Sequence, residues 1–294
     1  MDKFLLGTNP LLGVDHMDRA RARTRRSTLD LQAIVRIIET SLRAGAQGLT
    51  FTVGPDIYSL LVAMKGMDVE SAIGLYPLVP DVQTFRAAIA EGKFLTLAEK
   101  LTKGLSLIEK TAAFVRGGVM MAKGDPIRLI ELSVDMELKK LTKLKPPRAT
   151  IKAVFIHEIM TDMAITLNAE SLMKDLVIYI SNFGVVPGFV TRNLCRFVEV
   201  CRGWGVPIER VAIMTPINKL GFQMTPSREA CEVVLNELNG TKIVAMSPLA
   251  GGRLGLEDGI SYLKSIHNLA SIAIGLSSEV HARETFEYLR KAMG

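Results

Sequence analysis

The feature that most constrains the fold of this 294-residue chain is a repeating alternation of short apolar runs and helical segments. The stretch 177–184, Val-Ile-Tyr-Ile-Ser-Asn-Phe-Gly, shows the plan: a β-branched run ends in polar residues, and a helical pattern follows. Strands that alternate with helices predict a parallel sheet buried on both faces. The pattern predicts eight strands, at residues 3–9, 48–53, 72–78, 151–156, 177–180, 210–214, 242–246 and 269–274.

Eight strand–helix units predict an α/β fold of the (β/α)₈, or TIM-barrel, type, formed by residues 1–294 as a single domain. Residues 91–148 interrupt the rhythm with a helical pattern, so we expect a helical insertion or an enlarged third helix after strand three. An open doubly wound sheet is the alternative, but the turn after the first strand lacks the Gly-x-Gly-x-x-Gly pattern typical of that fold.

Composition excludes several classes of protein. Hydrophobic residues make up 48% of the chain and charged residues 22%, which favours a large core over disorder. The chain has no apolar run of the ~18–20 residues that span a bilayer, and its first residues lack a signal-peptide pattern. We therefore expect a cytoplasmic protein without a membrane partner. The net charge of +6 suits a small anionic ligand, whereas 6% aromatic residues make a nucleic-acid partner unlikely.

Three cysteines, Cys195, Cys201 and Cys231, show no metal-type spacing. We interpret them as buried small hydrophobic residues in a reducing compartment.

Barrel enzymes carry their active sites at the carboxyl ends of the strands. His157 directly follows an apolar run and is the strongest candidate for a general acid or hydrogen-bond donor, the alternative being a histidine bonded to nearby backbone. Tyr76 is a second candidate, and His16 and Asp15 in the first loop are others. These two histidines with Asp15 and Glu158 also allow a metal site, although no spacing requires one.

Lys219, after strand six, could form a Schiff base if its ammonium group is desolvated; a structural or phosphate-binding lysine is the alternative. The loops after strands seven and eight of a barrel often bind phosphate. Here they contain Ser247, Gly251, Gly252, Arg253, Gly275, Ser277 and Ser278. Ordinary turn glycines and a helix-capping Ser278 are the structural alternative. Five arginines between residues 19 and 26 would add positive charge to the same rim.

Four motifs within about residues 150–290 resemble the aldo-keto reductase family. They are Ser181-Asn182, His157, the run Ala-Met-Ser-Pro-Leu-Ala-Gly-Gly at 245–252, and Ile-Gly-Leu-Ser-Ser-Glu-Val-His-Ala-Arg at 274–283. The resemblance implies a barrel that binds NADP(H). It further implies that Ser181 and Asn182 hold the nicotinamide carboxamide, and that Ser278 and Arg283 hold the adenosine phosphate.

The chain departs from the family's catalytic tetrad of Asp, Tyr, Lys and His. Strand two ends in Thr52-Val53 where the Asp is expected, Tyr58 is out of register with the family's Tyr, and no Lys follows strand three. Met246 stands where an aromatic residue stacks on nicotinamide. Three hypotheses remain: a divergent reductase of a small carbonyl substrate, either anionic or neutral; a non-redox lyase or isomerase of a phosphorylated metabolite; and a non-catalytic binding protein.

Overall fold

The computed structural model describes residues 1–13, 30–67, 71–82 and 129–294. Its strands are β1 (Phe4–Gly7), β2 (Gly48–Thr52), β3 (Ile73–Val79), β4 (Ala149–Ile151), β5 (Ala153–Ile156), β6 (Val186–Val190), β7 (Ala212–Pro216), β8 (Lys242–Met246) and β9 (Leu269–Gly275). Its α-helices are α2 (Leu31–Ala44), α3 (Pro55–Ala63), α7 (Leu129–Leu144), α8 (Glu158–Thr166), α9 (Glu170–Ser181), α10 (Leu194–Gly203), α11 (Arg228–Glu237), α12 (Leu256–Lys264) and α13 (Glu279–Met293).

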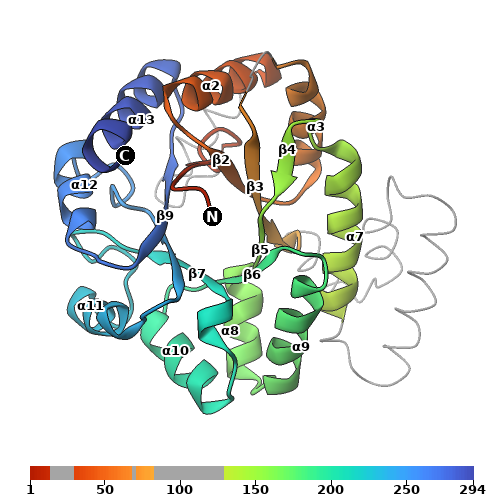
Figure 1. The fold of residues 1–294 in the computed structure, drawn as a ribbon, viewed down its shortest axis with the longest axis vertical. Helices are drawn as coiled ribbons and strands as arrows, with labels where there is room; N and C mark the ends of the chain where they lie inside the picture. The colour runs from red at the N-terminus through yellow and green to blue at the C-terminus, as the bar shows by residue number, and fades with distance from the viewer. Residues whose placement is uncertain (14–29, 68–70, 83–128) are drawn as a thin grey trace, which may run out of the picture.

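The strands close into a parallel barrel, which confirms the predicted (β/α)₈ fold. They pair in the order β2-β1-β9-β8-β7-β6-β5-β3, and β2 pairs with β3 to complete the ring. β4 and β5 both pair with β3 and are separated only by Lys152, so together they form one interrupted barrel strand. Figure 1 shows the helices around this ring and the N-terminus within it.

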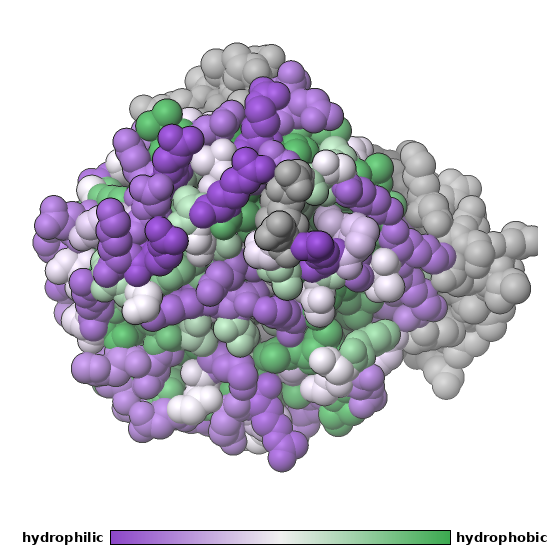
Figure 2. All heavy atoms as spheres, turned by 45° about the horizontal axis from the view of Figure 1, so that its top comes forward, coloured by the Kyte–Doolittle hydropathy of each residue, from purple (hydrophilic) through white to green (hydrophobic). Residues whose placement is uncertain are grey.

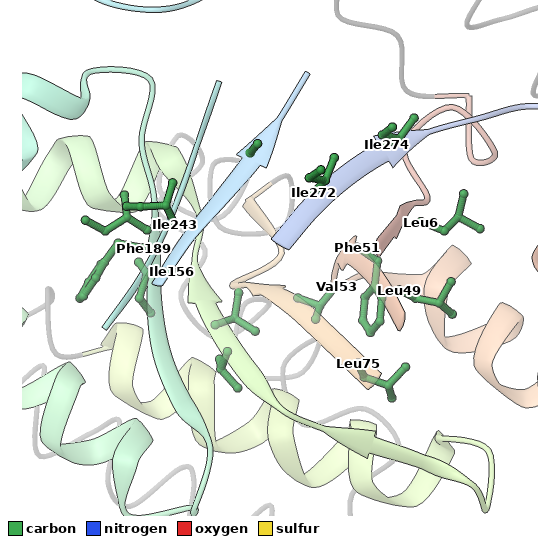
Figure 3. Packing of buried hydrophobic residues seen from close by; sticks show 14 of the residues in the cluster. Leu6, Leu49, Phe51, Val53, Leu75, Ile156, Phe189, Ile243, Ile272 and Ile274 are labelled. Carbon is green, nitrogen blue, oxygen red and sulfur yellow. The ribbon is translucent and has the colours of Figure 1, made fainter. Parts of the chain in front are cut away.

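Two hydrophobic layers hold the barrel together. Outward-facing residues of the strands, such as Leu49, Phe51 and Ile272, pack against the helices in one continuous cluster (Figure 3). A smaller cluster fills the interior of the barrel, and it includes Leu5, Phe155 and Val244. The alternation of inward and outward residues follows from the two-residue period of a strand, so it identifies which side chains point into the barrel.

The predicted strand at 177–180 is wrong. These residues belong to helix α9, and the fifth barrel strand is β6, which begins at Val186. The Val-Ile-Tyr-Ile run has strand-like composition, but its buried residues continue a helical pattern from Leu172 to Ile180. Short apolar runs of this kind fit a buried helix as well as a strand.

Of the expected insertion at 91–148, the described part is α7 and the residues that follow it to β4. Seven consecutive side chains, from Leu132 to Leu138, are buried, so this middle part of α7 does not expose one face, whereas Thr142 and Lys143 near its end are exposed. Whether the remainder forms a helical insertion stays a prediction, because residues 83–128 lie outside the described part.

Within the described residues, no helix is both long and apolar enough to cross a membrane. Figure 2 shows a surface on which hydrophilic side chains predominate, with hydrophobic ones in small groups.

Candidate functional site

His157 lies at the carboxyl end of the barrel, on the inner face. Ala153 and Phe155 of β5 belong to the interior cluster, and His157 continues their two-residue period. It is also the N-cap of α8: its Nδ1 accepts a hydrogen bond from the Ile159 amide at 3.3 Å. A neutral histidine that accepts through Nδ1 carries its proton on Nε2. The backbone bond expected as the structural alternative is therefore present, and it selects the tautomer that donates from Nε2.

Arg192 and Glu158 form a fork-like ion pair beside His157. Nε and Nη2 of Arg192 donate to the two carboxylate oxygens of Glu158 at 2.9 and 2.8 Å, which joins the ends of β5 and β6. The pair is partly exposed, and the guanidinium has further N–H groups for which the described residues show no partner. Asp162 lies nearby: burial and the charge of Glu158 raise the pKa of its carboxyl, while Arg192 opposes the shift.

The loops after β7 and β8 meet through Arg253. Its guanidinium lies over the ring of Phe222, 5.2 Å from the centroid. Asn218 fixes the Phe222 backbone by a reciprocal pair of hydrogen bonds, donating to its carbonyl at 2.9 Å and accepting from its amide at 2.8 Å. The cation–π contact therefore places an arginine on a firmly held loop at the rim.

The β8–α12 loop also contains four residues with positive φ, namely Ser247, Ala250, Gly251 and Gly252. The amides of Ala250 and Gly252 donate within this loop, to the carbonyls of Ser247 and Leu249, each at 2.9 Å. The Gly251 amide has no backbone acceptor among the described residues, so it is the one that can contribute to binding an anion. Gly251, Gly252 and Arg253 are exposed.

Lys219 is exposed rather than desolvated. Its Nζ pairs with Asp258 at 2.8 Å, and the two side chains are 50% and 61% exposed. The condition for a Schiff-base lysine is therefore not met.

The loop after β9 leads into α13 through Ser278. The Ser278 hydroxyl accepts a hydrogen bond from the His281 amide at 3.2 Å, so the predicted helix cap is confirmed, and the hydroxyl keeps its own hydrogen to donate. Ser277 is half-buried and Arg283 is exposed on the first turns of α13. Gly275 lies against Pro10: a Cβ at this position would come within 2.7 Å of the proline ring.

Tyr76 is not at the carboxyl rim, contrary to the prediction. β3 continues to Val79, so Tyr76 lies inside the barrel, fully buried, and its hydroxyl accepts the Asp2 amide at 2.6 Å at the opposite, amino end. Burial raises the pKa of the Tyr76 hydroxyl. The residue therefore cannot supply the proton donor expected of it at the rim.

The predicted position of Ser181 and Asn182 is also wrong, because they end helix α9 instead of following a strand. Ser181 donates to the Val177 carbonyl at 2.7 Å within the helix. The residues that follow the fifth barrel strand are Thr191, Arg192 and Asn193. Sequence reasoning missed them, although Asn193 carries a usable signal: it caps α10 by accepting the Arg196 amide at 3.2 Å.

Tyr58 lies in a buried polar cluster between α3 and α7. Its hydroxyl contacts the Glu137 carboxylate, and Lys140 lies 3.2 Å from the other oxygen of Glu137 and over the Tyr58 ring. Burial and the charges of Glu137 and Asp81 raise the pKa of the Tyr58 hydroxyl. A tyrosine that donates to a substrate alkoxide needs the opposite shift, so Tyr58 does not replace the missing tetrad member.

Asp15 and His16 lie outside the described residues, as do the five arginines near them, so their roles remain predictions. In the part of the chain that the structure describes, no group of three histidine, cysteine, aspartate or glutamate side chains is arranged to hold a metal ion.

No family model and no curated protein sequence matches this chain. Solved structures do match its fold. A candidate aldo-keto reductase from Pseudomonas aeruginosa is 13% identical with a TM-score of 0.56, and the match covers 99% of this chain and 91% of that one. A second structure from that organism, also described as a candidate aldo-keto reductase, is 14% identical with a TM-score of 0.55, covering 99% and 90%. At these identities the likeness concerns the fold alone, a (β/α)₈ barrel.

Proposed function

We propose that this protein binds NADP(H), or a closely related nucleotide, across the loops after β8 and β9 and reduces a small carbonyl substrate at His157. The observation that carries the proposal is a shared position: His157, whose Nδ1 accepts the Ile159 amide, follows a barrel strand at the same barrel end that carries the β8–α12 loop and Arg253. The similarity in fold to candidate aldo-keto reductases supports it as an analogy.

The residues of the two loops fit the phosphate groups of such a cofactor. The amides of Ala250 and Gly252 donate within the β8–α12 loop, so the donors suited to anionic oxygens are Arg253, the Gly251 amide and the hydrogen of the Ser278 hydroxyl. Arg283, exposed on α13, would add a second guanidinium. When bound, the cofactor supplies a hydride.

The protein's own part at the reacting end falls to His157. Its Nε2–H would donate to the carbonyl oxygen and stabilise the negative charge that develops there. Arg192 follows the barrel strand after which a Ser-Asn pair was expected, so the nicotinamide end of the site would differ from the family pattern. A guanidinium beside His157 favours a substrate with an anionic group, such as a 2-oxo acid.

A second candidate is a non-redox lyase or isomerase of a phosphorylated metabolite. The position of Tyr58 favours it, because its hydroxyl is committed to Glu137 and its pKa is raised, which leaves proton donation to His157 alone among the described candidates. The same phosphate-binding loops would serve a sugar or triose phosphate.

The test is consumption of NADPH with matched neutral and anionic carbonyls, in the wild type and in His157→Gln. We expect turnover with a preference for the anionic substrate, and a fall of about 100-fold in kcat for His157→Gln with NADPH affinity unchanged. Binding of NADPH without turnover of any carbonyl would contradict the reductase. Lack of NADPH binding, combined with binding of phosphorylated metabolites, would establish the second candidate instead.

A further inference from the structure

Thr52, the last residue of β2, faces the interior of the barrel at its carboxyl end. Leu49 and Phe51 of the same strand pack outward against the helices (Figure 3), so Thr50 and Thr52 face inward by the two-residue period of a strand. Thr52 is half-buried, and its hydroxyl has no hydrogen-bond partner among the described residues. The hydroxyl is therefore a donor that a ligand in the mouth of the barrel can reach.

Two backbone hydrogen bonds to the end of β3 hold Thr52 and His157 on either side of that strand. The Val53 amide, next to Thr52, donates to the Leu78 carbonyl at 3.0 Å. The His157 amide donates to the Val79 carbonyl at 2.8 Å. One strand therefore separates the two residues, so their Cα atoms lie about 10 Å apart, two strand spacings. Inward side chains from these positions converge on a gap that a small group can fill.

The register of the strands places Thr52 and His157 at the same height in the barrel. In a barrel of eight parallel strands, inward residues from alternate strands form layers of four. From Thr52, a shift of one residue at each strand pairing leads around the ring and back to Thr52. The layer nearest the carboxyl end that this path defines is Thr52, His157, Pro216 and Gly275. Proline and glycine have no side-chain donor, so Thr52 and His157 supply the polar side chains of the layer.

The layer beneath is apolar and accessible. The same path, begun one strand further on, gives Gly7, Leu78, Val190 and Met246. Leu78 and Met246 are only partly buried although they line the barrel interior, so the mouth of the barrel is open to this depth. Hydrogen bonds made against an apolar layer are stronger than the same bonds in water.

We propose that the Thr52 hydroxyl is a second hydrogen-bond donor to the substrate carbonyl oxygen, beside His157. The inference rests on the carbonyl reduction proposed above. Thr52 transfers no proton: it donates a hydrogen bond that strengthens as negative charge develops on the oxygen. Its contribution therefore affects kcat, and the binding of NADPH does not depend on it.

Thr52→Val removes the hydroxyl and keeps the branched shape of the side chain, so it tests this role in NADPH-dependent reduction of a carbonyl. We expect kcat to fall about 10- to 100-fold, with NADPH affinity unchanged, because one of two donors to the oxyanion is lost. Thr52→Ser restores a hydroxyl and should recover most of the lost rate. Thr50→Val is the matched control: it is the same substitution on the same face of β2, deeper in the barrel, and should keep the wild-type kcat.

The outcomes separate this inference from the function on which it rests. If the wild type reduces a carbonyl and Thr52→Val is as active as Thr50→Val, Thr52 has no catalytic role and the reductase stands. A Thr52→Ser variant as slow as Thr52→Val would also overturn the inference, because the hydroxyl would not be the group that matters. Failure of the wild type to reduce any carbonyl would overturn both. Urea denaturation shows that each variant is folded, and Thr52→Ala replaces Thr52→Val if valine disturbs the packing.

Discussion

The two ends of the barrel are both polar, but they use their polar groups in opposite ways. At the amino end, Asp2 enters the barrel and its backbone is held on both sides: its amide donates to Tyr76 and its carbonyl accepts from Ser271 at 2.5 Å. The Asp2 carboxylate pairs with Lys152 through Oδ1 at 2.5 Å, whereas its Oδ2 is buried with no hydrogen-bond partner among the described residues. We call Asp2 and its contacts the plug of the barrel. Gly48 and Gly74 leave the space that the plug occupies, since a Cβ on Gly74 would lie 1.8 Å from Asp2 Oδ2.

At the carboxyl end, the polar groups are each held by the protein at an identifiable atom. His157 is fixed through Nδ1, Arg192 through one edge of its guanidinium and Ser278 through its hydroxyl oxygen. Arg192 and Ser278 have hydrogens for which the described residues show no acceptor, and these can be donated to a ligand. The two ends therefore differ in access: the unpaired Asp2 Oδ2 is enclosed against Gly48 and Gly74, whereas Arg192 and Ser278 keep donors at a partly exposed rim.

The largest expected effect is at the amino end. Gly74→Ala places a methyl group against Asp2 and the Tyr76 ring, and neither can move without breaking the plug. We expect a loss of about 2–3 kcal/mol in the free energy of unfolding, measured by urea denaturation. Gly203→Ala is the matched control, because a Cβ at that position meets nothing within 4 Å. Equal stability of the two variants would show that the plug is not tightly packed.

The next largest effect distinguishes the structural role of Tyr76 from the catalytic role proposed for His157. Tyr76→Phe leaves the Asp2 amide without its acceptor in a buried place, which should cost about 1–2 kcal/mol of unfolding free energy. Because Tyr76 is remote from the rim, we expect ligand affinity and kcat to be unchanged. A fall in kcat without a matching loss of stability would return Tyr76 to the list of catalytic residues.

A smaller effect is expected at the ion pair of the rim. Glu158→Gln removes the charge that neutralises Arg192, and for a partly exposed pair the stability loss should be below about 1 kcal/mol. We expect KM to fall several-fold for an anionic carbonyl and to stay constant for a neutral one. Glu170→Gln, which breaks the exposed pair with Lys174, is the control and should change neither KM. Equal effects on both substrates would exclude Arg192 as the anion-binding group.

The smallest effect concerns Asp162. Its pKa is raised in the folded protein, so folding favours the protonated carboxyl, and this contribution is lost as pH rises from the unfolded pKa through the folded one. Asp162→Asn should therefore gain stability relative to the wild type as pH increases from about 3 to about 7. Solvent screening limits the gain to below about 0.5 kcal/mol. Unfolding free energies across this range give the sign, and a relative loss with rising pH would contradict it.

The sequence predicts the barrel well because the period of two within strands and the polar strand ends are local signals. His157 follows from them directly. The position of Tyr76 does not follow from these signals, because β3 runs three residues beyond it and its hydroxyl lies at the amino end of the barrel. Ser181 and Asn182 were misassigned because composition alone does not separate a strand from a buried helix such as α9. The Arg192–Glu158 pair arises from a tertiary contact that no local pattern reveals.

The central claim is that the carboxyl end of the barrel binds the ligand, and that the amino end, which is also polar, does not. Calorimetric titration with NADPH tests it most directly, in the wild type, in Ser278→Ala combined with Arg283→Ala, and in Tyr76→Phe. We predict that the affinity for NADPH falls by about 10-fold or more in Ser278→Ala with Arg283→Ala, since each lost charged hydrogen bond is worth roughly 1.5–3 kcal/mol. We predict that the affinity is unchanged in Tyr76→Phe. Wild-type affinity in the rim variant, or loss of binding in a folded Tyr76→Phe, would contradict this account.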